Sequence, residues 1–382
     1  MRKEYTVLHI TQSLGGVETS IRSIVNNIDD RIFKSIILCP DPDLEVTGKS
    51  GSKVKTYYIP YCREVSILND LKHILATIKL VKRVKPDLLH CHSAKGGFIG
   101  RLAGYLAGIP TIYTPQGFSY LCTDDPLRRA LFLSLEKLAR SWTTLLLACS
   151  ESEVQRAILD LNIPKEKVKL WKNCIAHPTL SIQRERPFAE PYIFSVGRPS
   201  FQKNVEMLVL TVLALRESGL PIRCVLAGAG LYSPLKEKIL DLIKQHELEN
   251  LFILLDWIEH EETLKLLAHA ECFVLASRYE GLPYSILEAM ALGKPVVATN
   301  VDGTKDCVIN NHTGFLVDLY DIESMKDAVA RLVQCAETRT ELGLNARSHF
   351  VEHYDVSKNI QALEGIYQEL LQVRDRSTLL SK

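Results

Sequence analysis

The chain has 382 residues, of which 46% are hydrophobic and 24% charged, a composition typical of globular proteins with large cores. Its length predicts two domains. The formal charge is only +1, but residues 1–190 hold 27 basic and 19 acidic side chains, whereas residues 191–382 hold 19 and 26. This distribution excludes a uniformly basic nucleic-acid binder, and we expect no nucleic-acid partner.

The cysteines and the amino-terminal residues point to a cytoplasmic protein. The two closest cysteines, Cys39 and Cys62, are 23 residues apart, which fits neither a zinc knuckle nor a CxxC redox motif. The apolar stretch within residues 1–10 is too short for a signal peptide. The uncharged stretch 102–123 contains two prolines and several glycines, so we do not expect it to span a membrane.

Short apolar runs alternate with helical patterns, and runs of this length between helices are typical of buried parallel strands. The pattern pauses over residues 181–191, a charged segment with two prolines, where we place the linker. We therefore predict an α/β fold with two doubly wound, Rossmann-like domains over residues 1–182 and 191–356. An amphipathic helix over 357–373 should pack back on the first domain. The expected strands include 7–10, 35–39, 87–90, 111–113, 144–149, 192–196, 223–227, 251–255, 272–275 and 295–298.

The first expected strand runs into a loop that contains Gly15 and Gly16, and helical periodicity begins at Val17. A glycine pair between a strand and a helix lets backbone N–H groups approach an anion closely. The pattern is equally compatible with a tight turn that binds no ligand.

A loop with two cationic residues, Arg198 and Lys203, follows the expected strand 192–196. At the carboxyl end of a parallel strand, a planar guanidinium and an ammonium group can hold a diphosphate. The alternative is a pair of solvated surface charges.

The segment 273–298 reads as strand, loop, helix from about Pro283, glycine stop at Gly293 and next strand. Glu280 lies in the loop and Glu288 in the helix, so both can line one crevice. The helix amino terminus suits phosphate, and the carboxylates can accept hydrogen bonds from sugar hydroxyls. Since a carboxylate beside phosphate needs hydroxyl or cationic partners, the pattern favours a nucleotide sugar; two surface glutamates are the alternative.

Taken in this order, these motifs resemble those of the retaining family 4 glycosyltransferases of GT-B architecture, in which two Rossmann-like domains face each other across a cleft. The first half is most similar to bacterial polysaccharide-assembly enzymes. The resemblance spans nearly the whole chain and includes Gly15-Gly16-Val17-Glu18, Pro86–Ser93, Tyr113–Phe118, Ala148–Glu153, Gly197–Asn204, Ala227–Gly230, Glu280–Glu288 and Asn311–Val317.

The resemblance implies roles for individual residues. Arg198 and Lys203 would hold the donor diphosphate, Glu288 the ribose and Glu280 a hydroxyl of the donor sugar, with Glu280 counted as catalytic. Other positions would contribute chiefly through the backbone: Gly281, Leu282 and Pro283 at the sugar and phosphates, Gly15 and Gly16 from the first domain, and residues 255–258 at the base.

The implied reaction is retaining transfer of a hexose or N-acetylhexosamine from a nucleotide sugar, expected to be UDP-linked. The acceptor would be a lipid-linked or other glycan, in the biosynthesis of a cell-surface polysaccharide such as lipopolysaccharide or capsule. We expect no metal or other cofactor, because Arg, Lys and helix N–H groups can neutralise the departing diphosphate. The sequence Asp41-Pro-Asp43 looks like a metal-binding DxD motif, but it lies in a polar turn, so we do not expect it to bind a metal.

Two alternatives of the same architecture stay open: a nucleotide-sugar epimerase and a non-catalytic nucleotide-sugar-binding protein. A dehydrogenase is disfavoured because Gly228-Ala-Gly230 is followed by Ser233 where a dinucleotide loop needs its third glycine.

Gln116 departs from the family pattern, in which His is common at this position. A neutral amide can bind a sugar but cannot act as a general base. His92 and His90 are nearby candidates for the general base, and the alternative for each is a structural role. The acceptor proton could instead pass to the departing phosphate.

The segment 67–85 combines an apolar stripe with five Lys or Arg residues. Such a helix could lie on an anionic membrane surface or meet a lipid-phosphate acceptor, which would make the protein peripheral at the inner face of the plasma membrane. The alternative is an ordinary surface helix with its apolar face on the core.

Overall fold

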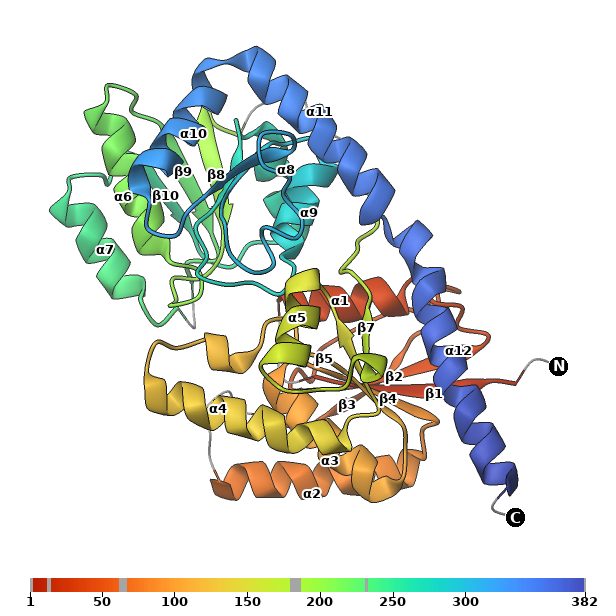
Figure 1. The fold of residues 1–382 in the computed structure, drawn as a ribbon. Helices are drawn as coiled ribbons and strands as arrows, with labels where there is room; N and C mark the ends of the chain where they lie inside the picture. The colour runs from red at the N-terminus through yellow and green to blue at the C-terminus, as the bar shows by residue number, and fades with distance from the viewer. Residues whose placement is uncertain (1–2, 12–14, 62–66, 179–186, 231–232, 381–382) are drawn as a thin grey trace. The chain divides into compact units, whose positions relative to one another are not determined.

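The computed structural model describes residues 3–11, 15–61, 67–178, 187–230 and 233–380 (Figure 1). The chain forms two compact units, the first made of residues 1–176 and 356–382 and the second of residues 177–355. The predicted end of the first domain at residue 182 and most of the predicted linker lie outside the described residues.

The first unit is built on a seven-stranded parallel sheet with the order β3-β2-β1-β4-β5-β6-β7. Its central strands are almost fully buried because helices cover both faces, which explains their continuous apolar runs. The strands are β1 (Tyr5–Ile10), β2 (Phe33–Cys39), β3 (Lys55–Tyr58), β4 (Leu88–His92), β5 (Thr111–Thr114), β6 (Leu145–Ala148) and β7 (Val168–Leu170).

Two sets of helices cover this sheet. On one face Val7 and Phe33 pack with Leu363 and Tyr367 of the carboxyl-terminal helix α12 (Val356–Leu380), beside α1 (Gly16–Val25). The opposite face carries α2 (Ile67–Val84), α3 (Ala94–Ala107) and α4 (Pro126–Ala139), which lie together in Figure 1. Helix α5 (Glu151–Leu159) packs with α4 in one apolar cluster. Three short 3-10 turns complete this unit: Ser119–Leu121, Arg140–Trp142 and Lys165–Lys167.

The second unit has a six-stranded parallel sheet with the order β10-β9-β8-β11-β12-β13. The strands are β8 (Tyr192–Val196), β9 (Arg223–Ala227), β10 (Phe252–Leu255), β11 (Phe273–Leu275), β12 (Val296–Thr299) and β13 (Gly314–Val317). Helices α6 (Val205–Glu217), α7 (Lys236–Gln245) and α10 (Ile322–Gln334) pack on one face, while α8 (His260–His269), α9 (Tyr284–Ala291) and α11 (Ala336–His353) complete the unit. Two parallel sheets with helices confirm the α/β prediction.

Each sheet has a point where the strand order reverses, between β1 and β4 in the first unit and between β8 and β11 in the second. The loops after the two strands at such a point run to opposite faces, which opens a crevice at the carboxyl ends of the strands. Gly15 follows β1 and Ser93 follows β4. Lys203 follows β8 and Glu280 follows β11, so most of the predicted site residues lie beside these two reversals.

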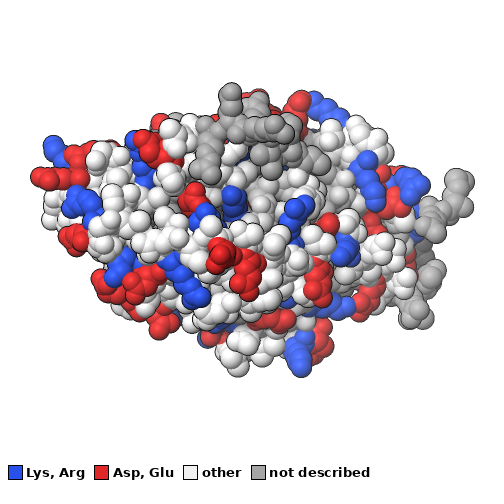
Figure 2. Space-filling model, turned by 90° about the horizontal axis from the view of Figure 1, so that it is seen from above, with Lys and Arg blue, Asp and Glu red and all other residues white. Residues whose placement is uncertain are grey.

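On the face shown in Figure 2, basic and acidic side chains alternate without a large area of one sign. Nine cysteines of the described chain are free thiols, and seven of them are buried. Within the described residues, no helix is both long and apolar enough to cross a membrane.

Candidate active site

The loop after β8 holds Lys203 against the backbone of Gly197. A side chain at position 197 would bring its Cβ to 2.9 Å from Cγ and Cδ of Lys203, so the glycine makes room for the lysine stem. Asn204 then adopts a left-handed conformation, and its Nδ2 donates to the carbonyl of Ala276 at 3.0 Å. The amide of Asn204 therefore ties the loop after β8 to the loop after β11.

Glu280, in the loop after β11, is 7% exposed and has three side-chain partners. Its Oε1 lies 2.7 Å from Nζ of Lys203 and accepts from the hydroxyl of Ser277 at 2.6 Å, while Oε2 accepts from Nε2 of Gln202 at 3.1 Å. A buried carboxylate is tolerated only when paired and hydrogen-bonded, and this one is both. Two predicted site residues, Lys203 and Glu280, therefore meet in one charged cluster.

Gly303 supports Glu280 from the loop after β12. Its φ is +83°, and a Cβ there would lie 2.7 Å from the backbone C and O of Glu280. The neighbouring Asp302 carbonyl accepts from the Glu280 amide at 2.9 Å. Only glycine permits this close approach, so Gly303 fixes the position of the Glu280 backbone.

The backbone over Gly281–Pro283 is buried and leads into α9. Pro283 precedes the first helical residue, a position where its fixed φ suits helix entry. The first amide groups of a helix carry a partial positive charge toward its amino end, which favours an anion there. Leu282 is 2% exposed and anchors the turn in the core.

Glu288 lies inside α9, and its Oε1 is 2.7 Å from Nε2 of His260, the first residue of α8. Glu288 is buried, whereas the imidazole of His260 is 67% exposed. The hydrogen bond to Glu288 raises the pKa of His260 above its ordinary value, against an opposing effect of desolvation. The carboxylate predicted to bind the ribose, that of Glu288, is thus hydrogen-bonded to His260. His260 follows closely on residues 255–258, the segment expected to receive the base.

Arg198 directly follows Gly197 and is half-buried. Among the described residues its guanidinium has neither a hydrogen-bond partner nor a carboxylate within ion-pair distance, in contrast to Lys203. Its charge is therefore not neutralised by the described part of the second unit.

In the first unit, Gly15 adopts φ +81° and ψ −129° immediately before Gly16 begins α1. The Gly15 carbonyl accepts from the amide of Thr19 at 3.0 Å. No described atom lies within 4 Å of the position a Gly15 side chain would take, so it is the backbone conformation that favours glycine here.

Gln116 has φ +55° and is half-buried, and its Nε2 has no hydrogen-bond partner among the described residues. The adjacent turn is held by Glu153, which lies in the first turn of α5. The Glu153 carboxylate accepts from the amides of Gly117 at 2.5 Å and Cys149 at 2.9 Å. Glu153 thus positions the turn on which Gln116 lies.

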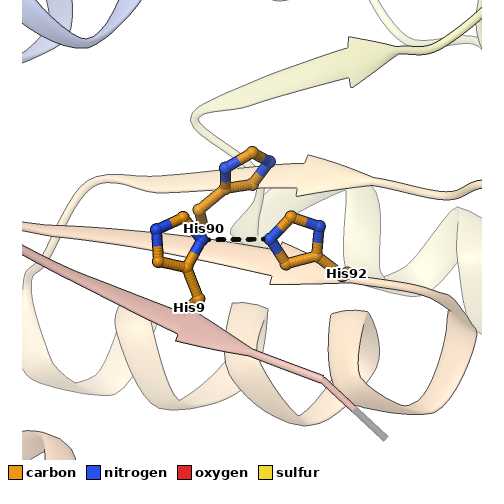
Figure 3. Close-up of side chains that lie close together, drawn as sticks. All are labelled: His9, His90 and His92. Atoms are coloured by element: carbon orange, nitrogen blue, oxygen red, sulfur yellow. Dashed lines mark hydrogen bonds between the residues drawn. The ribbon is translucent and has the colours of Figure 1, made fainter. Parts of the chain in front are cut away.

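His92 lies with His9 and His90 on one side of β1 and β4 (Figure 3), and all three are fully buried. Nδ1 of His9 faces Nε2 of His92 at 3.2 Å. His90 bonds to the hydroxyl of Tyr367 at 2.6 Å and to Oγ1 of Thr114 at 2.9 Å. Burial lowers the pKa of His9 to about 3 and that of the other two well below the ordinary value, so all three are neutral at pH 7.

Within the described part of the chain, these histidines form a group whose ligand atoms all lie within 4.8 Å, close enough to hold a metal ion. Both nitrogens of His90 already have partners, however, and the closest nitrogens of His9 and His92 face each other rather than a common point. The contacts are those of a hydrogen-bonded core cluster. A catalytic role for His92 remains a prediction from the sequence.

Sequence reasoning missed the supporting residues Gln202, Ser277, His260, Gly303 and Glu153. Gln202 lies beside Lys203 in the same loop, and Gly303 follows a strand, so each carried a weak signal. His260 carried none, because its contact depends on how α8 packs beside α9.

The comparisons with known proteins agree with this architecture. Residues 15–174 match the glycosyl transferase 4-like domain, and residues 179–349 match the glycosyl transferases group 1. The chain is 26% identical over 370 residues to the UDP-Gal:alpha-D-GlcNAc-diphosphoundecaprenol alpha-1,3-galactosyltransferase of Escherichia coli, covering 94% of this chain and 95% of that one. It is 25% identical over 354 residues to the capsular polysaccharide biosynthesis glycosyltransferase CapM of Staphylococcus aureus, covering 86% and 90%.

HepE of Anabaena, solved in complex with UDP-glucose, has the same fold with a TM-score of 0.79. That alignment covers 96% of this chain and 100% of HepE at 18% identity. Fold and comparisons together define a glycosyltransferase of GT-B architecture. Specifically, the chain belongs to the group 1 glycosyltransferases that carry a 4-like amino-terminal domain, and its relatives include enzymes of bacterial polysaccharide synthesis.

Proposed function

We propose that the chain is a retaining glycosyltransferase that moves a hexose or N-acetylhexosamine from a UDP-sugar to a lipid-linked glycan during cell-surface polysaccharide synthesis, on the cytoplasmic side of the membrane. The observation that carries the proposal is the cluster of Lys203, Glu280 and Ser277 at the strand-order reversal of the second unit. Support for UDP and for a lipid diphosphate acceptor comes from the names of the relative in Escherichia coli and of the HepE complex.

The residues of this cluster have complementary tasks in the proposed reaction. Lys203 and Arg198 neutralise the charge that grows on the departing diphosphate, and the amino end of α9 adds its partial charge. Glu280, already desolvated and hydrogen-bonded, accepts a hydrogen bond from a donor-sugar hydroxyl and keeps Lys203 in place. Glu288 accepts from the ribose hydroxyls. These groups suffice without a metal ion, so we propose a metal-independent enzyme.

Gln116 leaves the proton of the acceptor hydroxyl without a protein base at that position. We propose that this proton passes to the departing phosphate oxygen, while Gln116 positions the acceptor with its amide. The arrangement suits retention, because the acceptor then attacks from the side that the diphosphate leaves.

The test is a product assay with purified protein, a panel of UDP-, GDP- and ADP-sugars, and a GlcNAc-diphospho-lipid acceptor, analysed by mass spectrometry. We expect release of UDP and an acceptor heavier by one sugar residue, formed equally well with and without a chelator. An α-linkage from an α-linked donor, read by NMR, would establish retention.

Two other outcomes would contradict the proposal. Conversion of the nucleotide sugar into its epimer without acceptor would favour the epimerase, and UDP binding without any product would favour a non-catalytic sugar-nucleotide-binding protein. Glu288→Gln tests the proposed ribose contact, because it should weaken UDP binding about 10- to 100-fold through loss of a charged acceptor.

A further inference from the structure

Exposed hydrophobic side chains gather on the outer surface of α2, α3 and α4. Of seventeen large exposed hydrophobic residues in the described chain, eight lie on these three helices. Those of the second unit are spread over separate elements, as Leu240, Ile309 and Leu344 show. Single exposed leucines are normal, but a concentration on neighbouring helices marks an interaction surface.

The leucines of α4 form a regular stripe that faces solvent. Leu127 is 81% exposed, Leu131 53% and Leu138 54%, and their spacing of four and seven residues places them on one side of the helix. The opposite side is fixed inward by Glu136, whose Oε2 lies 2.8 Å from Nη2 of Arg101 on α3. The outward position of the stripe is therefore set by a buried ion pair and not by a loosely attached helix.

Helix α2 repeats this arrangement. Leu68, Leu71 and Leu75 are exposed over the first three turns, while Thr77 and Val81 are buried against the core. Lys72 lies between Leu71 and Leu75, and the exposed side continues toward the carboxyl end of α2 as Lys79 and Lys82. The surface of this helix is thus apolar at one end and cationic at the other.

Cations flank both stripes. Most of the acidic side chains nearby already pair with a cation or cap a helix. Arg128 is exposed beside the α4 stripe. On α2, the carboxylate of Asp70 lies 2.5 Å from Nζ of Lys95, and on α4 Glu136 is buried with Arg101. At the amino end of α4, Asp124 and Asp125 are exposed, and Asp125 caps the helix by accepting from the amides of residues 127 and 128.

We propose that this leucine–lysine surface, made of the exposed sides of α2 and α4, docks the protein on an anionic phospholipid bilayer. The leucines enter the boundary between headgroups and acyl chains, and Lys72, Lys79 and Arg128 contact lipid phosphates. A second copy of the chain is a poorer occupant, because a two-fold contact would bring the same cations face to face. This inference rests on the proposed function for its lipid-linked acceptor. The evidence for the surface itself comes only from the exposed residues of α2 and α4.

Vesicle sedimentation tests the proposal without requiring catalysis. We expect the protein to pellet with vesicles of phosphatidylcholine and phosphatidylglycerol, and about tenfold or more weakly with phosphatidylcholine alone. Raising the salt concentration should weaken binding without abolishing it, since salt screens the cations but not the leucines. The variant Leu127→Ser/Leu131→Ser and the variant Leu71→Ser/Leu75→Ser should each lower vesicle affinity at least tenfold.

Leu344→Ser is the matched control, because Leu344 is 61% exposed on α11 of the second unit and should not affect vesicle binding. Because all of these leucines face solvent, the variants should keep the wild-type melting temperature and transfer to a soluble acceptor analogue. Absence of vesicle binding at low salt, or equal binding by wild type and both double variants, would overturn the docking surface while leaving the transferase assay unaffected. So would a wild-type dimer that Leu127→Ser/Leu131→Ser dissociates, since a second copy would then cover the surface.

Discussion

The ammonium nitrogen of Lys203 lies 2.7 Å from the Oε1 of Glu280, which joins the loop after β8 to the loop after β11. Both residues lie at the strand-order reversal of the second sheet, where parallel α/β sheets bind ligands. The pair holds a cation ready for a diphosphate and keeps a carboxylate dehydrated. The ion pair between Lys203 and Glu280 therefore positions both side chains of the site.

Lys203→Met should lower both stability and activity. The change leaves Glu280 buried without its cation, which costs about 2 kcal/mol of unfolding free energy, and it removes one charge from the diphosphate site, which should lower kcat/KM about 100-fold or more. The measurements are urea unfolding and the transferase assay.

The double variant Lys203→Met/Glu280→Gln separates the two effects. Removing both charges should recover most of the lost stability but none of the activity. Lys53→Met, which removes one member of the exposed ion pair Lys53–Glu45 in the first unit, is the control and should change neither quantity measurably. Recovery of activity in the double variant would show that Lys203 acts only by compensating Glu280.

His260→Gln should change the pH dependence of the second unit. Because the bond to Glu288 raises the pKa of His260 above 6.5, the bond stabilises the fold fully below pH 6.5 and loses this contribution as pH rises through the raised pKa. The difference in melting temperature between wild type and variant should therefore shrink between pH 6 and pH 8.5.

UDP binding provides an independent test of His260. Protonated His260 competes with the ribose for Glu288, so the ratio of UDP affinities between wild type and His260→Gln should rise with pH over the same interval. A ratio that does not change with pH would contradict this competition, and Glu288→Gln should remove the pH-dependent difference altogether.

The fold could be read from the sequence where strands are buried on both faces. The runs at β1, β4, β8 and β11 are apolar because helices cover them on two sides, and each expected strand is present. The edge strands β3 and β7 are only partly buried and mix Lys with apolar residues, so hydrophobicity gave no comparable signal. An edge strand pairs with only one neighbouring strand and is less covered by helices, so fewer of its side chains need to be apolar.

The sequence predicted which residues belong to the candidate site, but not which of them are in contact. Lys203 and Glu280 were identified because cations and carboxylates at strand ends suit a nucleotide sugar. Their direct contact follows from the adjacency of β8 and β11, which no spacing in the sequence encodes. His260 was missed for the same reason, since its contact with Glu288 joins two separate helices.

Gln116 and Glu153 should respond differently to substitution. Gln116→Ala should lower kcat/KM with little loss of stability, because the Gln116 Nε2 has no partner among the described residues. Glu153→Ala should cost about 2–3 kcal/mol of unfolding free energy, since it leaves the amides of Gly117 and Cys149 without their acceptor.

The reverse change tests the proposed proton route directly. Gln116→His introduces a titratable group, so its pH–rate profile should gain a limb between about pH 6 and 7 that wild type lacks. Because burial lowers the pKa of His92 well below its ordinary value, a limb of the wild-type profile that lies at a pH clearly below 6 and is lost in His92→Gln would instead assign the proton transfer to His92.

Acid should destabilise the first unit through its buried histidines. Burial lowers the pKa of His9 to about 3, whereas the unfolded chain protonates it near 6.5. Stability is therefore complete above pH 6.5 and falls as the pH drops below it, by about 2 kcal/mol at pH 5 from His9 alone. His9→Gln should lose less stability than wild type between pH 7 and pH 5 in urea unfolding, while His312→Gln, at an exposed position of the second unit, should behave like wild type. Equal acid sensitivity of His9→Gln and wild type would mean that His9 does not limit acid stability.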